Sequence, residues 1–144
     1  MKRIILVGPV ACGKSTLCQA LKNLQKIYRK TQAIEFSEEI IDTPGEYLEN
    51  RNYYKALIVT AVEADIVLLL QDCADSRHVY PPLFAGMFGQ KTVLGVVSKI
   101  DAALDDGQIS RAEAKLWEAG ASEVLKVSSM NGEGIELLRH RLAD

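Results

Sequence analysis

Residues 8–15 constrain the fold more than any other part of this 144-residue chain. They read GPVACGKS and follow the apolar run at residues 4–7. Their last two residues open a helical pattern that begins at Lys14. In a glycine-rich turn with this spacing between a strand and a helix, successive backbone N–H groups point inward. The positive end of the helix dipole adds to their attraction for anions. The sequence therefore predicts that residues 8–15, called the phosphate loop below, bind the phosphates of a nucleotide.

The positions of the phosphate loop have different expected roles. Gly8 and Gly13 permit backbone angles and a close approach that a side chain would block. Lys14 is expected to reach the terminal phosphates and to take part in catalysis, and the Ser15 hydroxyl is expected to bind Mg²⁺. The residues expected to contact phosphate are Gly8, Pro9, Val10, Ala11, Cys12, Gly13, Lys14, Ser15 and Thr16, together with Gly45 from a later turn.

Strand-like apolar runs occupy residues 4–7, 33–36, 39–41, 66–70, 93–97 and 124–127, and helical patterns occupy residues 14–24, 52–64, 109–119 and 135–142. Strands joined by helices form right-handed βαβ units and a parallel sheet. The sequence thus predicts one α/β domain over residues 1–144, a three-layer doubly wound fold whose five or six strands are mostly parallel. We expect a polar loop at residues 25–31 and a short hairpin that turns at residues 37–38. Leu116 and Trp117 are expected on the buried face of their helix.

A second polar segment, DTPG, begins at Asp42, directly after the apolar run at residues 39–41. Asp42 can hold Mg²⁺ through the water shell of the ion, and the Gly45 N–H is free to meet a terminal phosphate. Alone, Asp-x-Pro-Gly is an ordinary turn. Ligands of open α/β sheets bind at the carboxyl ends of the strands, where the phosphate loop also lies. We therefore expect Asp42 and Gly45 to belong to the nucleotide site.

Ser98, Lys99 and Asp101 follow the apolar run at residues 93–97 and are expected to bind the base. The Asp101 carboxylate can accept hydrogen bonds from N1–H and the 2-amino group of guanine, whereas adenine offers no such pair of donors. Leaving a buried carboxylate unpaired is costly, so one aspartate can select guanine strongly. GTP or GDP is therefore the favoured nucleotide, and ATP is the alternative. After the last apolar run come three residues whose backbone is expected to touch the base edge: Ser128, Ser129 and Met130.

Composition and charge exclude several other classes of protein. The formal net charge is -2, which predicts no general attraction to nucleic acid or anionic lipid. No apolar run is long enough to span a bilayer, and the apolar part of the first residues is too short for a signal peptide. The 3 cysteines include no C-x-x-C pair, which argues against a disulfide framework and a zinc site. We expect a cytoplasmic protein without nucleic-acid or membrane partners.

The four polar segments, in this order, resemble the G1, G3, G4 and G5 boxes of Ras-like small GTPases. A closer resemblance, to the EutP/PduV family, is carried by KTQAIEF at residues 30–36, IDTPGEY at residues 41–47, ENR at residues 49–51 and VSSMNGEGI at residues 127–135. This resemblance implies a protein of ethanolamine or propanediol utilisation, associated with a bacterial microcompartment and its shell proteins. It also leaves two activities open, that of a GTPase and that of an acetate kinase acting on acetate.

The resemblance to Ras-like GTPases implies roles for further residues, and the chain departs from the Ras-like pattern at three positions. Thr31 is the counterpart of the switch I threonine that covers Mg²⁺ and the terminal phosphate, the alternative being a surface threonine in a basic loop. Glu46 replaces the glutamine that orients the attacking water, and it could act instead as a catalytic base for a substrate hydroxyl or carboxyl group. Val10 replaces a glycine and projects toward the space of that water. Ser98 replaces an asparagine, and it can make fewer of the hydrogen bonds that brace the loop.

Three functions are consistent with these features. The first is a GTP-binding, slowly hydrolysing switch or assembly factor for a microcompartment, which Asp101 favours. The second is a small-molecule kinase that transfers a phosphoryl group between nucleotide and a carboxylate such as acetate. The third is a structural adaptor at the shell that keeps the fold without turnover. Val10 and Glu46 are compatible with the second and third functions.

Overall fold

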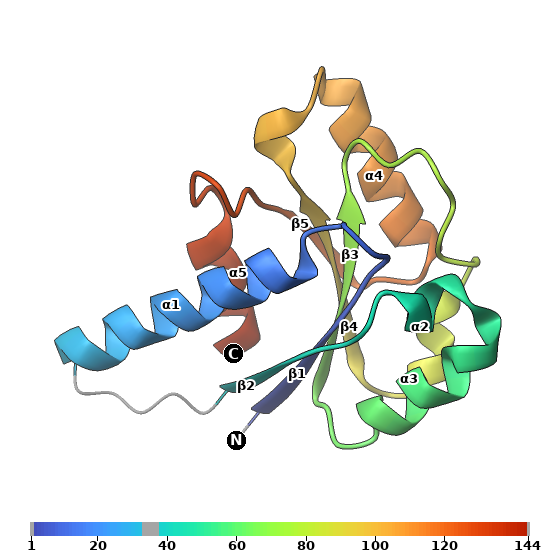
Figure 1. The fold of residues 1–144 in the computed structure, drawn as a ribbon, viewed down its shortest axis with the longest axis horizontal. Coiled ribbons are helices and arrows are strands. Elements are labelled where there is room, and N and C mark those ends of the chain that lie inside the picture. Colours follow the sequence, from blue (N-terminus) through green and yellow to red (C-terminus); the bar gives the residue numbers. More distant parts are fainter. Residues whose placement is uncertain (1, 33–37, 144) are drawn as a thin grey trace.

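Five strands form one sheet in which every pair of neighbours is parallel, in the order β2-β1-β3-β4-β5 (Figure 1). The computed structural model describes residues 2–32 and 38–143, and for residues 27–32 and 38 it describes the backbone alone. The strands are β1 (Lys2–Val7), β2 (Glu38–Asp42), β3 (Ile66–Asp72), β4 (Thr92–Ser98) and β5 (Glu123–Lys126). The predicted doubly wound fold is therefore confirmed.

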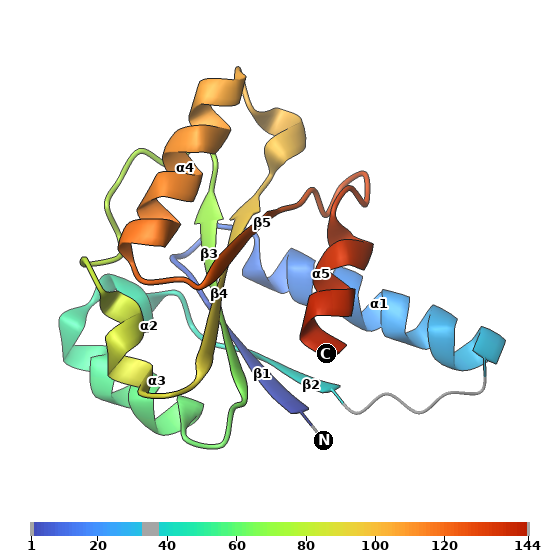
Figure 2. The same ribbon diagram turned by 180° about the vertical axis from the view of Figure 1, so that it is seen from behind.

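Helices cover both faces of the sheet (Figures 1 and 2). One face carries α1 (Lys14–Gln32) and α5 (Ile135–Ala143), and the other carries α2 (Glu46–Glu49), α3 (Tyr54–Ala61) and α4 (Asp106–Glu118). Short 3-10 helices occupy Arg51–Tyr53, Phe84–Phe88 and Ile100–Ala102. No helix within the described ranges is long and apolar enough to cross a membrane.

Side chains of β1 show how the two layers of core form. Ile4 and Leu6 pack in the core cluster that contains residues of α1 and α5, whereas Ile5 and Val7 pack in the cluster beneath α3 and α4. All four are fully buried. Because successive strand residues face opposite sides of a sheet and both sides are covered, a central parallel strand needs a continuous apolar run. That requirement is why such runs predicted the strands.

Two sequence expectations differ from the structure, and a third lies outside the described residues. The polar loop predicted at residues 25–31 is wrong, because α1 continues to Gln32; the segment is rich in lysine, arginine and glutamine and has neither glycine nor proline to end a helix. Trp117 is 51% exposed, so its predicted burial is wrong, although Leu116 is fully buried. The predicted strand at residues 33–36 and the turn residue Ser37 lie outside the described residues, and β2 runs parallel to β1.

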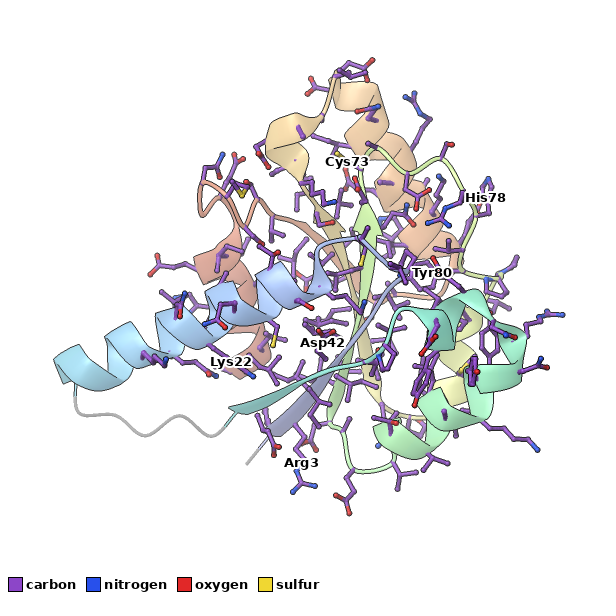
Figure 3. All side chains as sticks on the ribbon, viewed as in Figure 1. Arg3, Lys22, Asp42, Cys73, His78 and Tyr80 are labelled. Carbon is purple, nitrogen blue, oxygen red and sulfur yellow. The ribbon has the colours of Figure 1, made fainter. Side chains whose placement is uncertain are left out.

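Tyr80 links the end of β1, just before the phosphate loop, to β3 (Figure 3). Its buried hydroxyl lies 2.6 Å from the Leu70 carbonyl oxygen and 3.1 Å from that of Val7. Burial raises the pKa of Tyr80 well above its ordinary value, so the hydroxyl keeps its proton and acts as the donor. Val7 immediately precedes the phosphate loop, so this contact fixes the strand end from which the loop starts.

Replacing Tyr80 by phenylalanine is expected to lower the free energy of unfolding by about 1–2 kcal/mol, because buried carbonyl groups lose their donor while the ring is kept. Urea denaturation measures the change. Tyr53→Phe is the matched control: Tyr53 is 43% exposed, and its variant should stay within about 0.5 kcal/mol of wild type. Equal losses for the two variants would contradict the assigned role of Tyr80.

Candidate nucleotide site

The phosphate loop has the backbone shape of an anion-binding nest. Ala11 and Gly13 have φ angles of 66° and 98°, in the left-handed region. Alternation of such residues with ordinary ones turns neighbouring N–H groups toward one point. A left-handed alanine costs free energy, and strain of this kind gathers at functional sites. Gly8 is required for another reason: a Cβ there would lie 2.6 Å from Cys12 Sγ.

Cys12 is a packing residue of the phosphate loop. Its side chain is 2% exposed and fills the space beside Gly8. Burial raises the pKa of the Cys12 thiol above its ordinary value, and the nearby positive charge of Lys14 only partly opposes that rise. The thiol is therefore protonated, and the Cys12 contribution to an anion site comes from its backbone.

Lys14 begins α1 and is the buried cation of the site. The residue is only 7% exposed, and its ammonium group has no hydrogen-bond or ion-pair partner within the part of the chain that the structure describes. A cation that lacks a protein partner beside an anion-binding nest is available to pair with a ligand anion. An anion in the nest of the phosphate loop would supply the missing partner, so this lysine fits the predicted phosphate site.

Ser15 and Asp42 lie together, as a magnesium site requires. Ser15 Oγ donates a hydrogen bond of 2.8 Å to Asp42 Oδ2, which joins the start of α1 to the end of β2. Figure 3 shows Asp42 at that strand end, facing α1. Mg²⁺ prefers oxygen ligands and keeps several waters, usually taking few protein groups together with substrate phosphates. A hydroxyl and a carboxylate in contact beside the phosphate loop therefore fit this ion.

The backbone of α1 places Thr31 far from this pair. Thr31 is in the last turn of α1, whereas Ser15 is in the first, and the rise of an α-helix separates them by about 24 Å. A magnesium role for Thr31 therefore requires the end of α1 to unwind when nucleotide binds, and that role stays a prediction.

Gly45 packs directly against the phosphate loop. A Cβ at Gly45 would lie within 2.8 Å of Pro9 C and Val10 Cα, so only glycine fits this contact. The Val10 side chain points outward and is 59% exposed. Glu46 follows as the first residue of α2, and its exposed side chain has no partner among the described residues. Two of the three departures from the Ras-like pattern, Val10 within the phosphate loop and Glu46 after the turn that packs against it, are thus accessible.

Asp101 lines a hollow beside the phosphate loop and is held there by Ser128. Its Oδ1 accepts a hydrogen bond of 2.7 Å from Ser128 Oγ, which leaves Oδ2 available. Ser128 is fully buried and is itself fixed, because its Oγ also accepts a bond from the Asn131 N–H at 3.2 Å. The hollow has a volume of about 200 Å³ and is lined by residues that the sequence assigned to base or phosphate, with Ala102 added: Gly13, Thr16, Ser98, Lys99, Asp101, Ala102, Ser129 and Met130.

Ser98 and Lys99, at the end of β4, brace the phosphate loop. Its buried Oγ donates to the Cys12 carbonyl oxygen at 2.7 Å and lies 3.4 Å from that of Gln71. Lys99 adds a bond of 2.7 Å to the Ala11 carbonyl oxygen and an ion pair of 3.2 Å with Asp72. Ser98 therefore braces the phosphate loop with one short bond, and the expectation that a serine makes fewer of these bonds than an asparagine stays a prediction.

Sequence reasoning missed the roles of two side chains that position the site. The Ser128 hydroxyl orients Asp101, although the sequence assigned only its backbone to the base. Asp72, the last residue of β3, holds Lys99 by an ion pair. A polar residue at the carboxyl end of a strand was the available signal in both cases, because ligands of such sheets bind there. Ligand contacts at the site residues themselves remain predictions.

The whole chain matches a protein family. The model of the PduV-EutP family, described as ethanolamine utilisation and propanediol utilisation, matches residues 1–144. Propanediol utilization protein PduV of Citrobacter freundii is 43% identical over 136 residues, which cover 94% of this chain and 89% of that protein. Probable acetate kinase EutP of Escherichia coli is 34% identical over 145 residues, which cover 99% of this chain and 90% of that protein.

Solved structures show a similar fold. The FeoB G domain from Methanococcus jannaschii superposes with a TM-score of 0.64 at 23% sequence identity, covering 99% of this chain and 96% of that one. At this identity the likeness concerns the fold alone. It identifies the five-stranded sheet with its phosphate loop as a small P-loop G-domain fold.

Proposed function

The chain belongs to the PduV-EutP family of ethanolamine and propanediol utilisation proteins, and from this premise we propose that it binds guanine nucleotides and hydrolyses GTP slowly. Asp101 carries the proposal, because Ser128 holds its carboxylate at a hollow that leads back to Gly13. A base in this hollow would meet the free carboxylate oxygen, while its phosphates reach the phosphate loop.

Each residue of the site then has a physical task. The nest of the phosphate loop and the Lys14 ammonium bind the terminal phosphates and offset their charge. Ser15 and Asp42 would hold Mg²⁺, which supplies further positive charge to the transferring phosphoryl group. Lys99 braces the phosphate loop by its bond of 2.7 Å to the Ala11 carbonyl oxygen. Together these residues preorganise positive charge where negative charge grows during phosphoryl transfer.

Val10 and Glu46 are the proposed reason for slow hydrolysis. The attacking water needs space beside the terminal phosphate and a neutral group to orient it. The Val10 side chain lies beside that space, and the Glu46 carboxylate is repelled by phosphate oxygens. Combining Val10→Gly with Glu46→Gln is expected to raise the single-turnover rate of GTP hydrolysis at least about tenfold, or about 1.4 kcal/mol in barrier.

Stopped-flow phosphate release from wild type, both single variants and the double variant measures this effect. Nucleotide affinity should barely change, since neither side chain is required to hold the ground state. Glu49→Gln, the same change three residues later at the end of α2, is the matched control and should keep the wild-type rate. A fast wild type, or a double variant no faster than wild type, would mean that the attacking water lies elsewhere.

Acetate kinase activity is the second candidate, and two observations favour it. The related EutP of Escherichia coli carries the name probable acetate kinase, and Glu46 is an accessible carboxylate beside the phosphate loop. A base at Glu46 could take a proton from a hydroxyl acceptor or position the acceptor carboxyl group. In this case Glu46→Gln should abolish transfer to acetate and leave nucleotide binding intact.

Phosphate release and acetyl phosphate formation, measured with GTP and with ATP in the presence and absence of acetate, separate the candidates. We expect slow phosphate release from GTP that acetate does not change. Formation of acetyl phosphate that requires Glu46 would replace the GTPase proposal by the kinase. If neither phosphate nor acetyl phosphate forms while nucleotide binding is intact, the structural adaptor is favoured.

Family membership also supports a cellular setting. We propose that the protein acts in the cytoplasm at a utilisation microcompartment, with shell proteins as partners. Co-purification of tagged protein with intact microcompartments tests this setting. Recovery with the shells at the level of an unrelated cytoplasmic protein would argue against it.

A further inference from the structure

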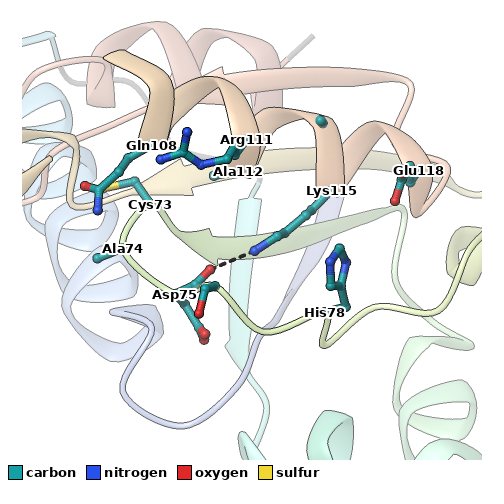
Figure 4. A pocket seen from close by; sticks show the side chains of 11 residues that line it. Cys73, Ala74, Asp75, His78, Gln108, Arg111, Ala112, Lys115 and Glu118 are labelled. Atoms are coloured by element: carbon teal, nitrogen blue, oxygen red, sulfur yellow. Dashed lines mark hydrogen bonds between the residues drawn. The ribbon is translucent and has the colours of Figure 1, made fainter. Parts of the chain in front are cut away.

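A second pocket lies between the loop that follows β3 and helix α4 (Figure 4). It has a volume of about 350 Å³, which is within the size range of small-molecule sites. It shares no lining residue with the hollow at Asp101. We call it the β3–α4 pocket, and its lining residues with polar side chains are Cys73, Asp75, Ser76, His78, Gln108, Arg111, Lys115 and Glu118.

The loop side of this pocket is firmly attached to the sheet. The Cys73 N–H donates to the Ser98 carbonyl oxygen at 3.2 Å, and the Cys73 thiol donates to that of Lys99 at 3.3 Å. The Lys115 ammonium, from α4, donates to the Asp75 carbonyl oxygen at 2.9 Å. Bonds from both sides therefore hold the two walls in place, so the pocket is formed before any ligand arrives.

Positive charge in the pocket is only partly neutralised. The Arg111 guanidinium has no hydrogen-bond or ion-pair partner in the described ranges 2–32 and 38–143. The Asp75 carboxylate is engaged elsewhere, because Arg77 binds both of its oxygens at 2.9–3.2 Å. These bonds lower the pKa of Asp75 and keep it paired with Arg77. Glu118, which also lines the pocket, lies about two helical turns along α4 from Arg111 and one turn from Lys115, so its charge acts mainly beside the lysine.

We propose that the β3–α4 pocket binds a small oxyanion, a carboxylate or a phosphate group, through Arg111 and Lys115. A planar guanidinium with free donors matches the oxygens of either group. Lys115 supplies a second positive charge from the same face of α4, one turn later. His78 lies opposite these side chains on the loop and can donate or accept a hydrogen bond (Figure 4). The site is separate from the proposed nucleotide site, so each can be present without the other.

Amide NMR spectra of isotope-labelled protein, titrated with acetate and with inorganic phosphate at constant ionic strength, test the proposal. We expect saturable shifts in residues 73–78 and 108–118 with at least one anion, and none with the neutral analogue acetamide. The anion that binds with the higher affinity identifies the chemical group that the pocket binds. Shifts in the phosphate loop are fitted separately, so they report on the proposed nucleotide site rather than on this one.

Arg111→Gln and Lys115→Gln should each weaken binding in the β3–α4 pocket at least tenfold. Lys55→Gln is the matched control, because Lys55 is exposed on α3 and does not line the pocket; it should bind as wild type does. Shifts that do not saturate with either anion, or equal affinity in wild type and both pocket variants, would overturn the proposal. Well-dispersed spectra of the variants establish that they are folded.

Discussion

Replacing Lys14 by alanine is expected to weaken nucleotide binding by about 3–5 kcal/mol, which is between about a hundredfold and a few thousandfold. Lys14 is 7% exposed and has no protein partner among the described residues, so in the proposed complex the phosphates are its partner. The variant would leave those phosphates facing a partly dry loop without a compensating cation. Calorimetric titration with GDP and GTP in the presence of Mg²⁺ measures the loss.

The same variant should differ little from wild type in stability without nucleotide, because the Lys14 ammonium has no partner among the described residues to lose. This combination separates a binding role from a structural one. Lys22→Ala is the matched control, since Lys22 is an exposed lysine on the same helix (Figure 3). Nucleotide affinity in Lys14→Ala equal to that of wild type would refute the phosphate site.

Replacing Asp101 by asparagine is expected to weaken GDP binding by about 2–3 kcal/mol, or roughly 30–150-fold. The carboxylate offers acceptors to the two donors on the guanine edge, and an amide places a donor against one of them. Xanthine carries an acceptor where guanine carries its 2-amino group, so the variant should prefer xanthosine diphosphate. Competition between the two nucleotides on wild type and variant measures the reversal.

The control for this reversal is Asp106→Asn, the same change at an exposed carboxylate in the first turn of α4. It should leave the preference for guanine unchanged. Asp101→Asn also keeps a group that can accept the bond from Ser128 Oγ, so the loop should keep its shape. A variant that loses affinity for both nucleotides equally would mean that Asp101 holds the loop rather than reading the base.

The strands and the phosphate loop could be predicted because their sequence requirements are local. A central parallel strand covered on both faces must be apolar throughout, as Ile4 to Val7 are, and the turn after it must be rich in glycine. The end of α1 could not be predicted in this way. Its polar residues are compatible with both helix and loop, so a count of apolar positions stopped the helix at residue 24 and left residues 25–31 as a loop.

Burial at a helix boundary is also hard to predict. Leu116 and Trp117 are adjacent, but neighbouring residues on a helix point about 100° apart. Leu116 lies fully buried against the sheet, where it crowds Gly95, and Trp117 is turned outward. The sequence pattern could not tell which of the two would face the sheet, and both were assigned to it.

Within the candidate site, the residues that hold others are harder to find than those that would touch ligand. Asp101 could be predicted from its place after a strand. The bond to it from Ser128 joins residues 27 positions apart in sequence, and no spacing rule predicts that contact. Likewise, the strength of Ser98 as a brace depends on the approach of the Cys12 carbonyl oxygen to 2.7 Å. Such contacts follow from packing of the strand ends, not from residue type.

Base selection by the wild-type protein is the decisive measurement for the guanine-nucleotide proposal. Calorimetric titrations with GDP and with ADP, each with Mg²⁺ and at one salt concentration, compare the two bases on identical phosphates. We expect GDP to bind at least about thirtyfold more tightly than ADP, since adenine cannot satisfy the Asp101 carboxylate. Equal affinity for the two nucleotides, or tighter binding of ADP, would contradict the proposal and would give the hollow at Asp101 another role.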